Sequence, residues 1–188
     1  MIKDLKIAVY KSPKTVFRLR DISILTGDTN FANLKAKLNY YVSKNVIMNP
    51  RKGIYVKEGY SREELACCLY TPSYISLETV LQKEGIIFQY SDVVTSVSYL
   101  ARAVTIDGRS FSFRKVKKSI LVSDAGIRRK NNVNIAGKER ALLDTLYLNK
   151  NFYFDNVNKI DKKKVRTLLR IYNSRALEKR TERLLNHA

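Results

Sequence analysis

The hydrophobic positions of the first sixty residues follow the spacing of helices and then of short paired strands. Leu19, Ile22 and Leu25 stand three residues apart, which predicts a helix. Gly27 suits the turn after it, because glycine readily adopts the positive φ of a helix end. In full, the pattern predicts a short N-terminal helix, helices over residues 19–25 and 31–44, and strands over residues 46–48 and 54–56.

The expected helix over residues 31–44 separates apolar side chains from small and polar ones. Its inner face carries Phe31, Leu34, Leu38, Tyr41 and Val42. Its outer face carries Asn33, Ala36 and Tyr40. An asparagine can form paired hydrogen bonds with adenine, and a lysine can reach guanine or a phosphate. This outer face is therefore a candidate DNA-reading surface, although a simple solvated face would explain this helix, taken alone, equally well.

A basic turn follows this helix and joins the two expected strands. A hairpin with Arg51 and Lys52 at its tip, directly after a candidate recognition helix, is typical of the wing of a winged helix-turn-helix. Such a tip lies beside a phosphate strand or an adjacent minor groove. The candidate DNA contacts of this region are Thr29, Asn30, Asn33, Lys35, Lys37, Tyr40, Arg51 and Lys52.

The remaining residues mix helix and strand patterns. Ser61 and Glu64 form a capping box that marks the start of this part, and Asp107-Gly108 is a typical hairpin turn. The expected elements are helices before Pro72 and over residues 76–83 and 138–148, strands over residues 93–97, 103–106 and 110–114, and two basic amphipathic helices near the end. We therefore expect an α+β protein, with an N-terminal winged helix-turn-helix over residues 1–60 and a mixed α/β domain over residues 61–188.

The charge of the chain narrows the class of partner. Lys and Arg number 36 against 17 Asp and Glu, which gives a net charge of +19 and an isoelectric point near 10.0. The first sixty residues carry +8 of this charge and the other 128 residues carry +11. Because such an excess attracts polyanions, a nucleic acid is the expected partner.

The sequence offers little for catalysis or metal binding. Its seven glycines are isolated, so no phosphate-binding loop of known spacing is present, and the single histidine is His187. Asp144 stands among leucines, where pairing with a base such as Arg140 or Lys138 explains it better than a catalytic role. We therefore expect no enzymatic activity, no catalytic residue, no cofactor and no metal site.

The compartment also follows from the sequence as an expectation. The adjacent Cys67 and Cys68 would form a strained bridge, so reduced thiols in a cytoplasmic protein are expected. Residues 1–11 are too short and too charged for a signal peptide. No uncharged apolar run approaches the roughly 20 residues that span a bilayer, so no membrane partner is expected.

Several blocks of the sequence resemble one protein family, the AbiEi-type antitoxins of abortive-infection (type IV) toxin–antitoxin systems. The blocks are VF at residues 16–17, KGIY at residues 52–55, YISLETVL at residues 74–81, GI at residues 85–86 and KERALLD at residues 138–144. The resemblance covers nearly the whole chain, but its motifs are mostly structural. The chain departs from the family at Gly137-Lys138, where members often have a proline before the acidic pair.

The resemblance implies a concrete function. Proteins of this family repress their own operon by binding inverted repeats in the promoter through an N-terminal winged helix. Their C-terminal domain counteracts a nucleotidyltransferase-like toxin, and whether the two proteins form a stable complex stays open. Chemistry would then belong to the toxin, and the basic C-terminal surface could extend the DNA footprint.

Two other functions stay open from the sequence. The chain could be a stand-alone DNA-binding transcriptional regulator, which an empty genomic neighbourhood would favour. It could also be an RNA-binding module that acts through the basic strips at residues 115–118 and 162–170 of the C-terminal part.

Overall fold

The computed structural model describes residues 4–186, and the chain divides into two compact units. The first unit is Met1–Leu69 and the second is Tyr70–Ala188, so the division lies after Leu69 and not after residue 60 as expected. The reason is a contact of the helix that follows residue 61. Its Glu64 carboxylate accepts hydrogen bonds from the main-chain amide of Thr15 at 2.9 Å and from its hydroxyl at 2.6 Å. The expected capping box is only half formed: the Ser61 hydroxyl accepts from the amide of Glu64 at 3.2 Å, but the amide of Ser61 donates to the Thr15 hydroxyl at 2.9 Å and not to Glu64. Ser61 therefore begins the last helix of the first unit.

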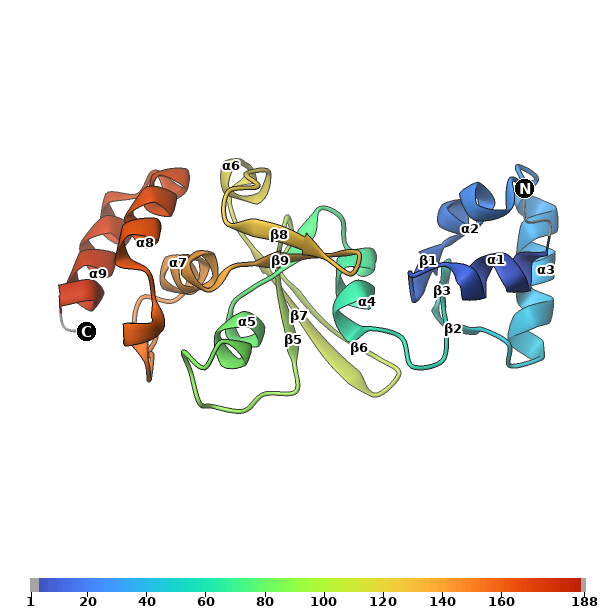
Figure 1. Ribbon diagram of the computed structural model, residues 1–188, viewed down its shortest axis with the longest axis horizontal. Helices are drawn as coiled ribbons and strands as arrows, with labels where there is room; N and C mark the ends of the chain where they lie inside the picture. Colours follow the sequence, from blue (N-terminus) through green and yellow to red (C-terminus); the bar gives the residue numbers. More distant parts are fainter. Residues whose placement is uncertain (1–3, 187–188) are drawn as a thin grey trace. The chain divides into compact units, whose positions relative to one another are not determined.

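The first unit combines helices with a small antiparallel sheet (Figure 1). Its elements are α1 (Leu5–Lys11), β1 (Val16–Arg18), α2 (Leu19–Thr26), α3 (Phe31–Ser43), β2 (Met48–Arg51), β3 (Ile54–Val56) and α4 (Arg62–Leu69). The strand order in the sheet is β1-β3-β2. The expected helices and hairpin are present, whereas β1 is an additional strand that pairs with β3 in the register Val16↔Val56. Three residues are too few to show a strand period.

The core of this unit lies between the helices and the sheet. It contains Leu5, Val9, Phe17, Ile22, Leu34, Leu38, Ile47 and Tyr55. Phe31, which the sequence pattern assigned to the inner face of α3, is 50% exposed and lies outside this core. As the first residue of the helix, it lies about one turn before Leu34, the first residue of α3 that belongs to the core. The expected turn at Gly27 is confirmed, with a φ of 73°.

The second unit is built on a six-stranded mixed sheet. The strand order is β6-β7-β5-β4-β9-β8, with the pairs β4–β9 and β5–β7 parallel and the other pairs antiparallel. The strands are β4 (Ser73–Ile75), β5 (Val94–Ser98), β6 (Arg102–Ile106), β7 (Arg109–Lys115), β8 (Ile127–Lys130) and β9 (Val133–Ala136). Helices and strands thus occur in both units, and the fold class is α+β.

Helices cover this sheet in successive layers, as Figure 1 shows. α7 packs on α5 and β9, and α8 and α9 pack on α7. The helical elements are α5 (Glu78–Lys83), α6 (Lys118–Leu121), α7 (Lys138–Leu148), α8 (Lys162–Leu169), α9 (Arg175–Asn186) and two 3₁₀ turns, η1 (Val157–Lys159) and η2 (Arg170–Tyr172). No helix within residues 4–186 is long and apolar enough to cross a bilayer.

Two details of the second unit differ from the sequence pattern. The helix expected from Ser76 begins only at Glu78, because Leu77 takes a positive φ of 59° and Ser76 continues the strand path of β4. β4, β8 and β9 were not expected as strands. The turn at Asp107-Gly108 is confirmed, with positive φ at both residues, and so is the helix over residues 138–148.

Candidate nucleic-acid interface

Helix α3 presents its polar face to solvent because two leucines anchor the opposite face. Leu34 and Leu38 are fully buried, one helical turn apart. This orientation leaves Asn33, Ala36 and Tyr40 exposed on the outer side. The helix therefore displays the small and polar face that the sequence pattern assigned to it, and backbone or base edges of a nucleic acid could approach it closely.

The start of α3 is fixed by Asn30. Its side-chain oxygen accepts a hydrogen bond from the main-chain amide of Asn33 at 3.1 Å, which makes Asn30 the N-cap. Thr29 and Asn30 are both exposed at this helix end. The free amides of a helix N-terminus favour an anion such as a phosphate. These two residues therefore lie where a DNA phosphate would bind. The side-chain oxygen of Asn30 is already occupied by the hydrogen bond of the cap.

Lys37 is engaged in an ion pair with Asp28. Its ammonium lies 3.1 Å from the Asp28 carboxylate, and its side chain is 49% exposed. The hydrogen bond from Lys37, helped by the amide of Asn30, lowers the pKa of Asp28 below its ordinary value. Lys37 must leave this pair to reach a phosphate or a base. Because exposed ion pairs contribute little to stability, that exchange costs little.

Tyr40 belongs to a group of aromatic and basic side chains near the end of α3. Tyr40 is 59% exposed, and the centre of its ring lies 5.7 Å from the centre of the Tyr41 ring in an edge-to-face arrangement. The Lys44 ammonium lies 5.8 Å from the centre of the Tyr40 ring. Lys44 was not expected among the DNA contacts, yet its position four residues after Tyr40 places it on the same helix face. Lys44 therefore joins the candidate interface.

The β2–β3 hairpin separates its two basic residues. Arg51 ends strand β2, pairs with Ile54 and is partly buried, whereas Lys52 and Gly53 form the exposed turn. The side-chain amide of Asn49 donates to the carbonyls of Arg51 at 3.0 Å and Ile54 at 2.7 Å, which closes the hairpin. The expectation that both basic residues occupy the tip is thus corrected. Lys52 is at the tip, and Arg51 lies one residue before it.

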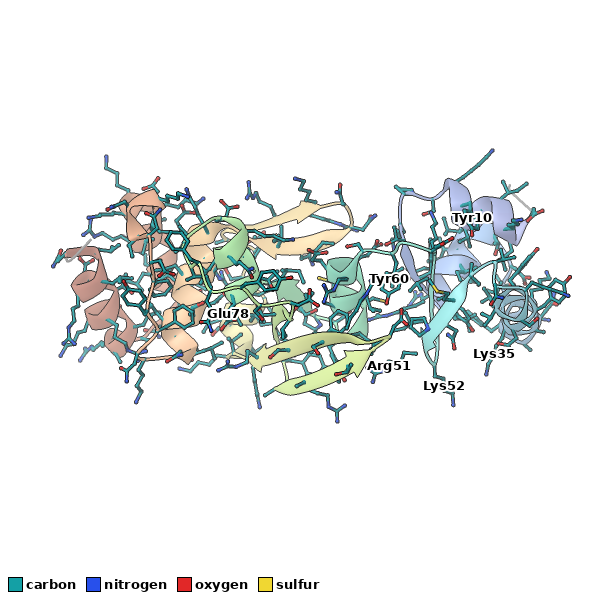
Figure 2. The ribbon with its side chains drawn as sticks, turned by 90° about the horizontal axis from the view of Figure 1, so that it is seen from below. Tyr10, Lys35, Arg51, Lys52, Tyr60 and Glu78 are labelled. Carbon is teal, nitrogen blue, oxygen red and sulfur yellow. The ribbon has the colours of Figure 1, made fainter. Side chains whose placement is uncertain are left out.

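Lys35, Arg51 and Lys52 lie on one side of the first unit. In Figure 2 these three side chains follow the same edge of the unit, and Tyr10 lies on the opposite side. Lys35 is exposed on α3, whereas the other two come from the hairpin. Two elements that are separate in the sequence thus contribute positive charge to one side, as contacts with a phosphate backbone require.

Asp144 lies inside the second unit, not in an open site. Its carboxylate accepts hydrogen bonds from the hydroxyls of Tyr172 at 2.6 Å, Ser76 at 2.7 Å and Tyr74 at 3.2 Å. The Arg140 guanidinium lies 3.4 Å away, and both charged side chains are fully buried. The expected pairing with Arg140 is therefore confirmed. Burial raises the pKa of the Asp144 carboxyl, and Arg140 and the three hydroxyls oppose that shift.

This buried cluster and the rest of the described chain offer no metal site. Within residues 4–186, no group of three His, Cys, Asp or Glu side chains is placed to hold a metal ion. His187 lies outside the described residues. Cys67 and Cys68 are not joined in a disulfide, and burial raises the pKa of Cys68. No protein-family model and no curated protein matches the sequence, so the resemblance to AbiEi-type antitoxins stays a prediction.

Proposed function

We propose that this protein is a non-enzymatic DNA-binding repressor whose first unit is a winged helix-turn-helix. In this proposal α3 enters the major groove, and Asn33, Lys37 and Tyr40 contact base edges or nearby phosphates. The β2–β3 hairpin is the wing, and Arg51 and Lys52 contact the phosphate backbone. Thr29, Asn30 and Lys35 bind phosphates beside the start of the helix.

One observation carries this proposal: the element order of the first unit together with its exposed polar helix face. A helix, a short strand, two helices and a hairpin follow one another, and the strand pairs with the hairpin in the order β1-β3-β2. In this arrangement the helix before the hairpin stands free on one side for a groove of DNA. The net charge of +8 over the first sixty residues supports the choice of a polyanion as partner.

The biological role rests on the sequence resemblance. We propose that the DNA is the protein's own promoter, bound at inverted repeats, and that the second unit counteracts a nucleotidyltransferase-like toxin encoded beside it. The protein would then be an autoregulatory antitoxin of the cytoplasm. Two alternative functions can be distinguished from this proposal, one by the neighbouring genes and one by mutagenesis. A stand-alone regulator has no such neighbouring gene, and an RNA-binding module loses its function when the lysines of residues 115–118 and 162–170 are replaced.

A reporter experiment tests the repressor. The region upstream of the gene is fused to a reporter, and the full chain is supplied from a second plasmid. We expect repression by the wild type, loss of repression by a double variant with Asn33→Ala and Lys52→Ala, and full repression by Lys150→Ala, an exposed lysine of the second unit. Equal repression by the double variant, at equal protein level, would contradict the proposed interface.

A rescue experiment tests the antitoxin separately. The adjacent nucleotidyltransferase-like gene is induced alone and together with this chain. We expect growth arrest in the first case and growth in the second, also when the chain carries the two interface substitutions. If the chain represses the reporter but does not rescue growth, it is a stand-alone regulator.

A further inference from the structure

Three large aromatic side chains of the second unit are exposed on two neighbouring loops. Phe88 is 69% exposed and Tyr90 78% exposed in the loop after α5, and Tyr153 is 78% exposed in the segment after α7. We call these three residues the aromatic platform. These are the three most exposed aromatic side chains among the described residues, and their grouping on two loops makes them a candidate interaction surface.

Hydrogen bonds hold the two loops of the aromatic platform together. The main-chain amides of Asp155 and Asn156 donate to the carbonyl of Ile86, at 3.0 and 3.1 Å. In return, the carboxylate of Asp155 accepts a hydrogen bond from the amide of Phe88 at 2.8 Å. Figure 1 shows the loop after α5 and the segment after α7 side by side, in agreement with these contacts. These hydrogen bonds fix the backbone at Phe88 and Asp155, two residues from Tyr90 and Tyr153, which lowers the entropy cost of ordering the loops on binding.

The aromatic platform belongs to a basic unit, and lysines lie beside it. Lys83 ends α5 and Lys150 precedes Tyr153 by three residues. The ammonium of Lys159 lies against Gly85, 2.8 Å from where a Cβ would stand. Three exposed acids, at residues 84, 92 and 155, lie in the same two loops and balance these lysines, whereas the second unit as a whole has 23 Lys and Arg against 11 Asp and Glu. The second unit therefore has a net charge of +12. This charge attracts a polyanion more strongly than it attracts a protein surface with few acidic groups.

We propose that the aromatic platform binds single-stranded RNA. Unpaired bases stack on exposed aromatic rings, and lysines beside the rings contact the phosphates between successive bases. A duplex does not fit this surface, because its bases are stacked on one another and present no free face. Gln89 and Asn151 are exposed amides that lie between or beside the rings in sequence, where they can bind a 2′-hydroxyl. This inference concerns the second unit alone and does not depend on duplex binding by the first.

Fluorescence anisotropy with a labelled oligouridylate of about 12 nucleotides tests the proposal on the full chain. We expect Tyr90→Ala and Tyr153→Ala each to raise the dissociation constant about tenfold, because each substitution removes one stacked base. Tyr153→Phe keeps the ring and is expected to bind as the wild type. Tyr99→Ala is the matched control, since Tyr99 is a 46% exposed tyrosine outside the two loops.

A tryptophan variant separates stacking from simple charge attraction. The chain has no tryptophan, so Tyr153→Trp introduces a single fluorophore. We expect oligouridylate to quench its emission at the concentrations that raise the anisotropy, and a duplex of equal length to leave it unchanged. Unchanged affinity of the alanine variants together with an unquenched tryptophan would overturn the proposal. Equal or tighter binding of oligothymidylate would overturn the assignment to RNA, and loss of self-association in Tyr153→Ala would assign the surface to protein contact instead.

Discussion

At the scale of single residues, the candidate interface depends on how each side chain of α3 is already engaged. In the helix cap, Asn33 donates a hydrogen bond from its main-chain amide only, and its side chain is exposed on the outer face. Lys37 is paired with Asp28 at 3.1 Å, so its substitution also removes an intramolecular ion pair. Asn33 therefore gives the cleaner test of base recognition, because the cap survives the loss of its side chain.

Asn33→Ala is expected to weaken promoter binding by about 1–3 kcal/mol, the magnitude of a lost base contact. Binding to unrelated duplexes should stay the same, because non-specific affinity comes from the phosphates. Anisotropy titrations with both duplexes measure the two effects. Asn158→Ala, an exposed asparagine of the second unit, is the control. If Asn33→Ala weakens both duplexes alike, Asn33 contacts the backbone and does not read a base.

The residues buried around Asp144 contribute to the stability of the second unit and not to binding. They are Arg140, Tyr74, Tyr172 and Ser76. The pKa values of Tyr74 and Tyr172 are raised, chiefly by burial, so both hydroxyls stay protonated and donate to Asp144. The cluster ties β4 to α7 and η2, because Tyr74 belongs to the strand and Tyr172 to the 3₁₀ turn. A buried ion pair that loses part of its hydrogen bonding leaves charge poorly compensated.

Tyr172→Phe is expected to lower the free energy of unfolding of the second unit by about 1–3 kcal/mol, since a buried acceptor loses a donor. Urea denaturation followed by circular dichroism measures the change. Tyr153→Phe removes an exposed hydroxyl and is the matched control, with no change expected. Equal stability of Tyr172→Phe and the control would show that the hydrogen bond at 2.6 Å contributes nothing net.

At the scale of elements, the candidate interface consists of helix α3 and the β2–β3 hairpin. The side chain of Asn49 closes this hairpin. The two hydrogen bonds from Asn49 fix the path between Arg51 and Ile54, so Lys52 projects from a defined turn. Pro50 lies in β2, which is an edge strand of the sheet, where the missing amide costs no ladder hydrogen bond. The register of β2 against β3 shifts between Met48 and Arg51, so Pro50 lies at an irregularity of an edge strand, where proline is tolerated.

Lys52→Ala is expected to weaken binding to all duplexes alike and to flatten the slope of log affinity against log salt by about one unit, because one phosphate contact is lost. Arg51→Ala is expected to act in the same direction. Titrations of promoter and scrambled duplexes over a salt series provide both readings. Lys150→Ala controls for the general loss of one charge. A change in sequence preference, with the salt slope intact, would be inconsistent with a phosphate-binding wing.

The elements also show what a sequence can predict. α3 and α7 are long enough for Leu34 and Leu38, or Leu142 and Leu146, to repeat at the helical period, and both were predicted close to their observed bounds. β1, β4, β8 and β9 have three or four residues each and exist through pairing with distant partners. For the candidate site, the exposed residues of α3 followed from periodicity. The ion pair of Lys37, the strand position of Arg51 and the role of Lys44 depend on tertiary contacts.

At the scale of the whole molecule, two compact units divide the chain, and both are basic. Helix α4 belongs to the first unit through the contact of Glu64 with Thr15, and the second unit has its own sheet and core. A chain cut before α4 would expose the face of this helix that packs in the first unit. This arrangement defines where a fragment can be made.

A fragment that begins at Tyr70 is expected to rescue cells from the toxin at least as well as one that begins at Ser61, because it carries no unpartnered α4. Growth during toxin induction measures rescue, and circular dichroism of both purified fragments checks folding. Failure of a folded fragment to rescue, while the full chain does, would show that the antitoxin function needs the first unit.

The central claim is that the protein recognises a specific duplex. Fluorescence anisotropy of the full chain is measured against its own upstream DNA, a scrambled duplex and a structured RNA, across a salt series. The account predicts tight binding to the upstream DNA that survives about 0.15 M salt, while the affinity for the other two falls steeply. Equal and salt-sensitive binding to all three ligands would contradict it, because the charge of the chain would then act only as a general attractor of polyanions.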